Sequence, residues 1–130
     1  MFLLSSRQAF YAWYNKKLDR LTSGTKATVK DAGQEGKELI VHYIETRGTA
    51  KSGKAGRIET GAMRDSVDTR VEKESATEIQ VSFGYYDAPF YTVFQEQGTR
   101  YIEAMNAIGD AWDIVKAGLE KDLRDEVRNA

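Results

Sequence analysis

The side chains that could carry out catalysis are few in this sequence and stand far apart. The single histidine, His42, lies in an apolar helical pattern, and the chain contains no cysteine. A nucleophilic triad needs a base beside its nucleophile, so we interpret His42 as a structural histidine. Carboxylates such as Asp65 and Asp68 lack the glycine-punctuated spacing of a calcium loop. We therefore expect no enzymatic activity, no metal site and no cofactor.

A basic, glycine-rich segment, residues 47–57, is the second place where chemistry is conceivable. It contains three glycines, four basic residues and no acidic residue. Gly53-Lys54 is followed by Ala55 rather than by serine or threonine, so the segment departs from a nucleotide-binding P-loop. The composition is typical of a solvated flexible loop, but such a loop could also contact DNA phosphates without sequence specificity. The candidate DNA-facing residues are Arg47, Lys51, Lys54 and Arg57.

The elements that would position these residues begin with a long helical pattern. A serine at position 5 or 6 can cap a helix whose apolar residues recur at helical spacing up to position 21. The spacing resumes over residues 25–46, and the sequence leaves open whether the helix breaks at Gly24. Gly33 and Gly36 each cost a helix about 1 kcal/mol relative to alanine. We expect a neighbouring element to pack very closely at these two glycines.

A hairpin and a second helix follow the basic segment. Residues 67–71 and 79–85 alternate apolar and polar side chains around a turn at Glu72–Thr77, which predicts two antiparallel strands with one buried face. Residues 90–96 are compatible with a third strand or with a short helix. Residues 104–128 predict an amphipathic helix that covers the sheet. The predicted fold class is therefore α+β, with helices on one sheet face.

Composition limits the chain to one domain. It has 130 residues, 41% of them hydrophobic, and fourteen aromatic residues, which is enough to fold one core. We assign residues 1–46 as helical, 47–57 as loop, 58–99 as the sheet region and 104–128 as the last helix. A net charge of -1 excludes a global basic excess for nucleic acid. Neither a signal peptide nor a run of about 20 apolar residues is present, so we expect a soluble protein.

Two short segments resemble motifs of a known family. Glu59-Thr60-Gly61-Ala62-Met63-Arg64-Asp65-Ser66-Val67 resembles the Thr-Gly, apolar, Arg, any residue, Ser, aliphatic motif of the head-tail joining proteins of long-tailed bacteriophages, also called neck or tail-completion proteins. Phe94-Gln95-Glu96-Gln97-Gly98-Thr99 resembles the second motif of that family, which precedes its final helix. The motif residues are Thr60, Gly61, Met63, Arg64, Ser66, Phe94, Glu96, Gly98 and Thr99.

Physical chemistry suggests structural roles for these motif residues. Gly61 can supply a left-handed backbone or a close approach, and Gly98 can close a turn in which Thr99 bonds the local backbone. Arg64 has the fork geometry to bind a carboxylate, and Glu96 is our candidate partner, within one subunit or between two. Simple turn chemistry and an interface role remain equally open for these residues.

The resemblance implies a structural virion protein at the head-tail interface, present in the host cytoplasm during assembly. It implies a homo-oligomeric ring around the DNA channel, with genomic DNA in the lumen and no membrane partner. The implied neighbours are a head-closure or connector protein and the tail terminator or tail tube protein. Rings of identical subunits need two complementary faces. Our candidate for one face, which core packing explains equally well, is Tyr85, Tyr86, Phe90 and Tyr91.

Three alternatives remain. The chain could be a tail terminator-like ring protein, because sequence composition does not separate that role from tail completion. It could be a small nucleic-acid-binding module that uses residues 47–57. It could also be a small regulatory enzyme or toxin-like domain with a carboxylate site at Glu96, although Gly98 is the only distinguishing feature near that residue.

Overall fold

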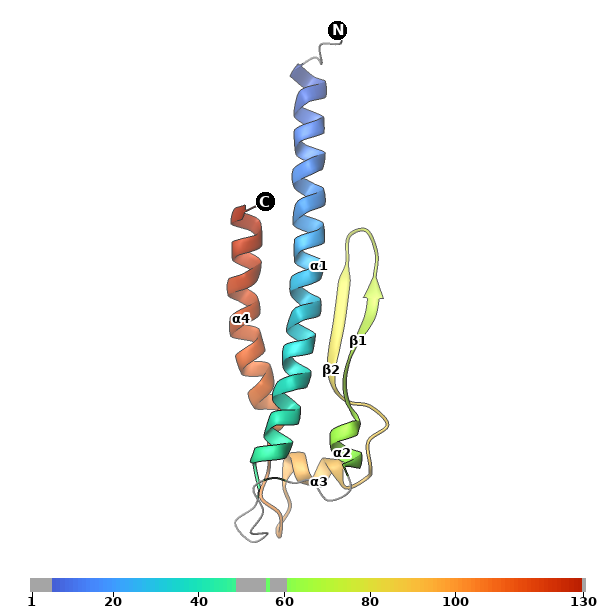
Figure 1. Cartoon of the computed structure of the whole chain (residues 1–130), viewed down its shortest axis with the longest axis vertical. Helices are drawn as coiled ribbons and strands as arrows, with labels where there is room; N and C mark the ends of the chain where they lie inside the picture. The colour runs from blue at the N-terminus through green and yellow to red at the C-terminus, as the bar shows by residue number, and fades with distance from the viewer. Residues whose placement is uncertain (1–5, 49–55, 57–60, 130) are drawn as a thin grey trace.

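The structure, a computed structural model, describes residues 6–48, 56 and 61–129. It has the α+β class predicted from the sequence, with a long first helix, a two-stranded antiparallel sheet and a last helix that packs along the first (Figure 1). In chain order the elements are α1 (Ser6–Thr46), α2 (Ala62–Asp65), β1 (Val67–Glu74), β2 (Ile79–Tyr85), α3 (Thr92–Gln97) and α4 (Ala107–Asn129).

Helix α1 runs without a break through Gly24 and has 41 residues. The question that the sequence left open is thus answered in favour of one helix. At a rise of 1.5 Å per residue, α1 is about 60 Å long. Its lower half lies between the hairpin and α4, and its N-terminal half projects beyond both (Figure 1).

The hairpin prediction is confirmed, with a shorter turn than expected. The strands β1 and β2 pair from Val67 opposite Tyr85 to Glu74 opposite Ile79, with a register shift between Val71 and Lys73. This bulge lets β1 continue to Glu74, so the turn occupies residues 75–78 rather than 72–77. Glu72, the extra residue, has no partner in the register, and pairing continues on both sides of it.

The close approach expected at Gly33 and Gly36 is also confirmed. A Cβ atom added at Gly36 would lie 2.6 Å from the ring of Phe83, and one added at Gly33 would overlap the side chains of Thr69 and Val81. All three contacted residues are on the hairpin. Glycine at these two positions therefore lets α1 pack directly against one face of the sheet.

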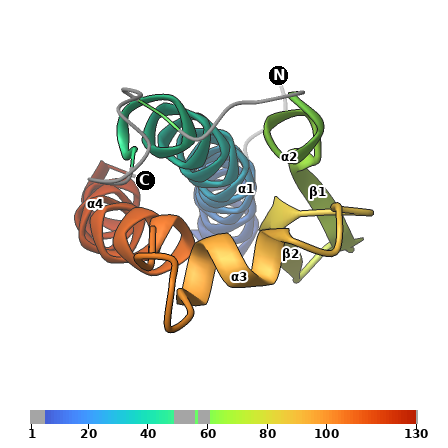
Figure 2. The ribbon, with the colours of Figure 1, turned by 90° about the horizontal axis from the view of Figure 1, so that it is seen from below.

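The core lies in the lower half of the molecule, where all the elements meet (Figure 2). Helix α4 packs along α1. Its first turns also reach the sheet, where the centres of the Trp112 and Phe83 rings lie 6.4 Å apart. Residues 92–97 form the short helix α3 rather than a strand. The buried cluster consists of Ile40, Ile44, Met63, Val67, Met105, Ala107 and Ala111.

Candidate functional site

Glu96 lies at the junction between α3 and α4 and caps the start of α4. Its Oε1 accepts hydrogen bonds from the Tyr85 hydroxyl at 2.7 Å and from the Ala107 N–H at 3.1 Å, and its Oε2 accepts one from the Ile108 N–H at 3.3 Å. The first N–H groups of a helix have no partners within the helix and carry partial positive charge. The carboxylate thus has a structural role within the chain.

The pairing of Arg64 with Glu96 within one subunit is wrong. Arg64 Nε lies 3.5 Å from Asp65 Oδ1 instead. The Glu96 carboxylate accepts hydrogen bonds from Tyr85 and from the N-terminus of α4.

The last helix begins at Ala107 rather than at the predicted residue 104. The reason is local, because the backbone N–H groups of residues 105 and 106 donate to the carbonyls of residues 95 and 96.

The second family-like motif ends in the turn that the sequence predicted. Gly98 has a φ of 76°, and a Cβ there would lie 2.8 Å from the Ala104 backbone nitrogen. Thr99 Oγ1 accepts hydrogen bonds from the N–H groups of Tyr101 and Ile102, each at 3.1 Å. These two residues therefore fold the chain back from α3 toward α4, as expected from turn chemistry.

The first motif forms a comparable turn at the entry to β1. Gly61 has a φ of 82° and precedes α2, which confirms the expected left-handed backbone. Ser66 Oγ donates a hydrogen bond to the Met63 carbonyl at 2.6 Å, and the Ser66 carbonyl accepts one from the Tyr86 N–H at 2.9 Å. Met63 is buried in the core. Thr60 lies outside the described residues.

Arg47, one of the candidate DNA-facing residues, is bound to other residues of the same chain. Its guanidinium lies 3.7 Å from the centre of the Tyr43 ring, donates to the Met105 carbonyl at 3.0 Å and forms a short ion pair with Asp110. It therefore ties the end of α1 to the start of α4. The other three candidates lie outside the described residues; they are Lys51, Lys54 and Arg57.

The tyrosine-rich segment is divided between the core and the surface. Tyr85 and Tyr91 pack against the core cluster, and Tyr86 is half-buried beneath the Arg70 guanidinium. Phe90 is 85% exposed. Further exposed apolar side chains lie on α3 and in the turn after it, and we call them together with Phe90 the α3 patch. The α3 patch consists of Phe90, Val93, Phe94 and Tyr101.

The N-terminal half of α1 carries a second exposed apolar surface, whose helical spacing is visible in the sequence and whose exposure is not. Trp13 is 57% exposed, and its neighbours on the helix are similarly accessible. The helical spacing that revealed these residues would be the same with or without a partner. We call this surface the N-terminal stripe. It consists of Phe10, Tyr11, Trp13, Tyr14 and Leu18.

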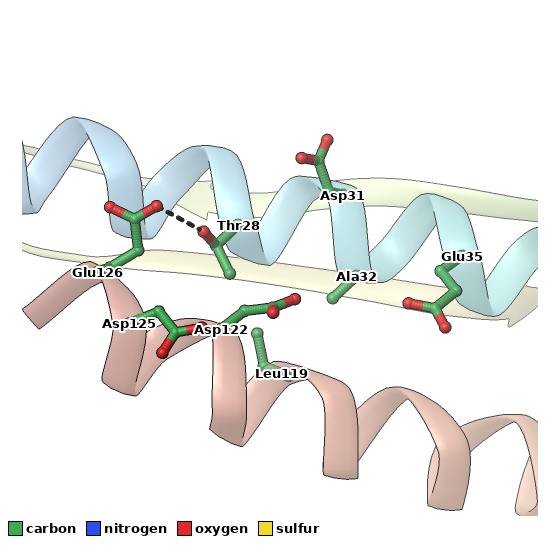
Figure 3. Close-up of a pocket in the computed structure, with 8 residues that line it drawn as sticks. All are labelled: Thr28, Asp31, Ala32, Glu35, Leu119, Asp122, Asp125 and Glu126. Carbon is green, nitrogen blue, oxygen red and sulfur yellow. Dashed lines mark hydrogen bonds between the residues drawn. The ribbon is translucent and has the colours of Figure 1, made fainter. Parts of the chain in front are cut away.

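An acidic groove of about 200 Å³ lies between α1 and α4 (Figure 3). Five of its eight lining residues are carboxylates, and none is basic. Its only hydrogen bond drawn in Figure 3 joins Thr28 Oγ1 to Glu126 Oε1 at 3.5 Å. The groove therefore concentrates negative charge between the two helices. The lining residues are Thr28, Asp31, Ala32, Glu35, Leu119, Asp122, Asp125 and Glu126.

Within the described ranges, no group of three or more histidine, cysteine, aspartate or glutamate side chains is arranged to hold a metal ion. In the same residues, no helix combines the length and apolar character needed to cross a membrane. The prominent features of the surface are thus two apolar regions and one acidic groove.

Comparisons with protein-family models, with curated proteins and with solved structures found no match.

Proposed function

We propose that this chain is a structural subunit of the neck of a long-tailed bacteriophage. Copies of the chain form a ring around the DNA channel and join the head to the tail. A head-closure or connector protein lies on one side of the ring, and the tail terminator or tail tube lies on the other. The proposal combines the two family-like motifs with the surfaces of the folded subunit.

The observation that carries the proposal is the N-terminal stripe. Covering a fully exposed large apolar side chain is worth about 1.5–3 kcal/mol. The five side chains of the stripe are about half exposed, so covering all of them would contribute on the order of 5 kcal/mol. A contiguous aromatic surface of this kind is typical of a protein–protein interface. The stripe thus supports a subunit that is completed by assembly.

The position of the α3 patch supports two different contacting faces. The N-terminal stripe lies on the projecting half of α1, and the α3 patch lies at the opposite end of the subunit (Figure 1). A ring requires heterologous contacts, in which one face binds a different face of the next copy, while stacked layers require exposed ends. An elongated subunit with apolar surfaces at both ends meets these requirements.

The family-like motifs support the same proposal through their structural roles. Gly61 and Gly98 have positive φ values, and Glu96 caps α4. These residues shape the end of the subunit that presents the α3 patch. The described residues of the motifs therefore serve folding and surface shape, as a structural assembly protein requires.

Sedimentation velocity over a wide concentration range, alone and with candidate connector and tail proteins, tests the proposal. We expect a discrete oligomer, or a complex with a neck or tail component, and a closed ring in negative-stain electron micrographs. A chain that stays monomeric at every concentration and binds none of these components would overturn the proposed function.

A further inference from the structure

One line of residues on α1 faces α4, and we call this line the seam. The seam continues into the N-terminal stripe. Counting back from the groove-lining Thr28, the alternating spacing of three and four residues passes through Gly24, Leu21, Lys17, Tyr14 and Phe10. Residues at this spacing lie on one face of a helix. Glu126, near the end of α4, lies against Gly24. The upper part of the seam therefore extends past the end of α4 and offers a surface for a further helix.

The charge of this segment distinguishes between possible partners. Residues 6–21 contain four basic residues and one acidic residue, which gives a net charge of +3. Two copies of the stripe packed against each other would bring like charges together. Lys17 lies within the seam and adds positive charge to the surface that a partner would cover. The stripe is therefore suited to an acidic surface rather than to a second stripe.

The acidic groove provides such a surface on the same chain. It has five carboxylates and no basic lining residue, and Leu119 adds an apolar contact. Val127, in the last turn of α4, is a further exposed apolar residue next to Glu126. The stripe and the groove are different surfaces of one subunit. Their contact is therefore heterologous and can propagate from copy to copy until a ring closes.

We propose that the N-terminal stripe of one copy docks on the acidic groove of a second copy. Lys17 and Arg20 bind the groove carboxylates, and the aromatic side chains pack along α4. The inference rests on the self-association in the proposed function and identifies the two surfaces that produce it.

Charge reversal on each surface tests the contact. The variant K17E/R20E and the variant D122K/D125K should each weaken self-association by about tenfold or more. An equimolar mixture of the two should restore it, because each variant then meets the opposite charge on the other. The variant K121E/R124E changes the net charge as much as K17E/R20E does, on exposed positions of α4 outside the groove lining, and should associate like the wild type.

Cysteine cross-linking tests the geometry, because the natural chain has no cysteine. Tyr14→Cys in one copy and Asp122→Cys in another should be joined by a short bismaleimide. Asp19→Cys, on the opposite side of α1 from the seam, should not join to Asp122→Cys. The cross-linking is performed on the chain alone and in any complex with a neck component.

The outcomes separate the two proposals. Restored association in the charge-reversed mixture, with selective cross-linking at position 14, supports the docking. Oligomers that are unaffected by both charge reversals overturn the docking and leave the proposed ring intact. A wild-type chain that remains monomeric alone and binds no neck component overturns the proposed function and the docking together.

Discussion

Replacing Gly36 by alanine tests the closest contact between α1 and the sheet. Alanine improves the helix propensity of this position by about 1 kcal/mol. The new methyl group would lie 2.6–2.7 Å from three atoms of the Phe83 ring, so the ring or the helix must move. Overpacking of this kind costs about 1–3 kcal/mol. We expect Gly36→Ala to lower the free energy of unfolding by up to about 2 kcal/mol.

Gly118 in α4 provides the matched control. A Cβ added at Gly118 meets no atom within 4 Å, so Gly118→Ala should gain helix propensity without a steric cost. We expect it to raise the free energy of unfolding by about 0.5–1 kcal/mol. The difference between the two variants then measures the steric cost at Gly36 with the propensity effect removed.

Urea unfolding, followed by circular dichroism at a single protein concentration, is the appropriate assay because association also contributes to stability. A double-mutant cycle with Phe83→Leu should recover part of the loss from Gly36→Ala, since the smaller side chain leaves room for the methyl group. If Gly36→Ala proves as stabilising as Gly118→Ala, the packing of α1 against Phe83 is refuted.

Three other changes test separate contacts. Glu96→Gln removes the charge that caps α4 and should lower the free energy of unfolding by about 1–2 kcal/mol in urea titrations, whereas an unchanged midpoint would exclude the cap. The hydrogen bond from the Thr69 N–H, helped by Lys37, lowers the pKa of Asp68 below its ordinary 3.8. The ionised Asp68 therefore stabilises the fold above pH 3.8, and this contribution is lost as the pH falls through the lower folded-state pKa. Asp68→Asn should flatten that part of the curve of unfolding free energy against pH. Identical curves for the variant and the wild type would contradict this role of Asp68. Arg47→Met should destabilise the fold by about 1–3 kcal/mol, and additive losses with Asp110→Asn would show that the ion pair is absent.

The fold was largely predictable because its elements have regular periodicity. Alternation in residues 67–71 and 79–85 predicted the hairpin, and Gly33 and Gly36 predicted a close contact before its partner was known. Continuity at Gly24 was not predictable from the sequence. One glycine costs a helix only about 1 kcal/mol, and the packing of Glu126 against this position comes from a segment about one hundred residues away.

The candidate site was less predictable because its contacts depend on tertiary structure. Glu96 stood out as a motif residue, but its partner was expected to be Arg64. A helix is usually capped by the residue immediately before it, whereas the carboxylate that caps α4 comes from the preceding helix, eleven residues before Ala107. Tyr85 likewise turned inward to bond this carboxylate. An aromatic residue in a strand can face the core or a partner with the same alternation.

The N-terminal stripe shows which sequence signal indicates an apolar surface that α4 leaves exposed. A helical apolar pattern requires a covering partner, but the pattern is identical whether the partner is in the same chain or in another. Length supplies the missing information. Helix α1 has 41 residues and α4 has 23, so 18 residues of α1, about 27 Å of helix, extend beyond what α4 can cover. Because the apolar spacing continues through Phe10 and Tyr14 into this excess, we expect the partner that completes it to come from another chain.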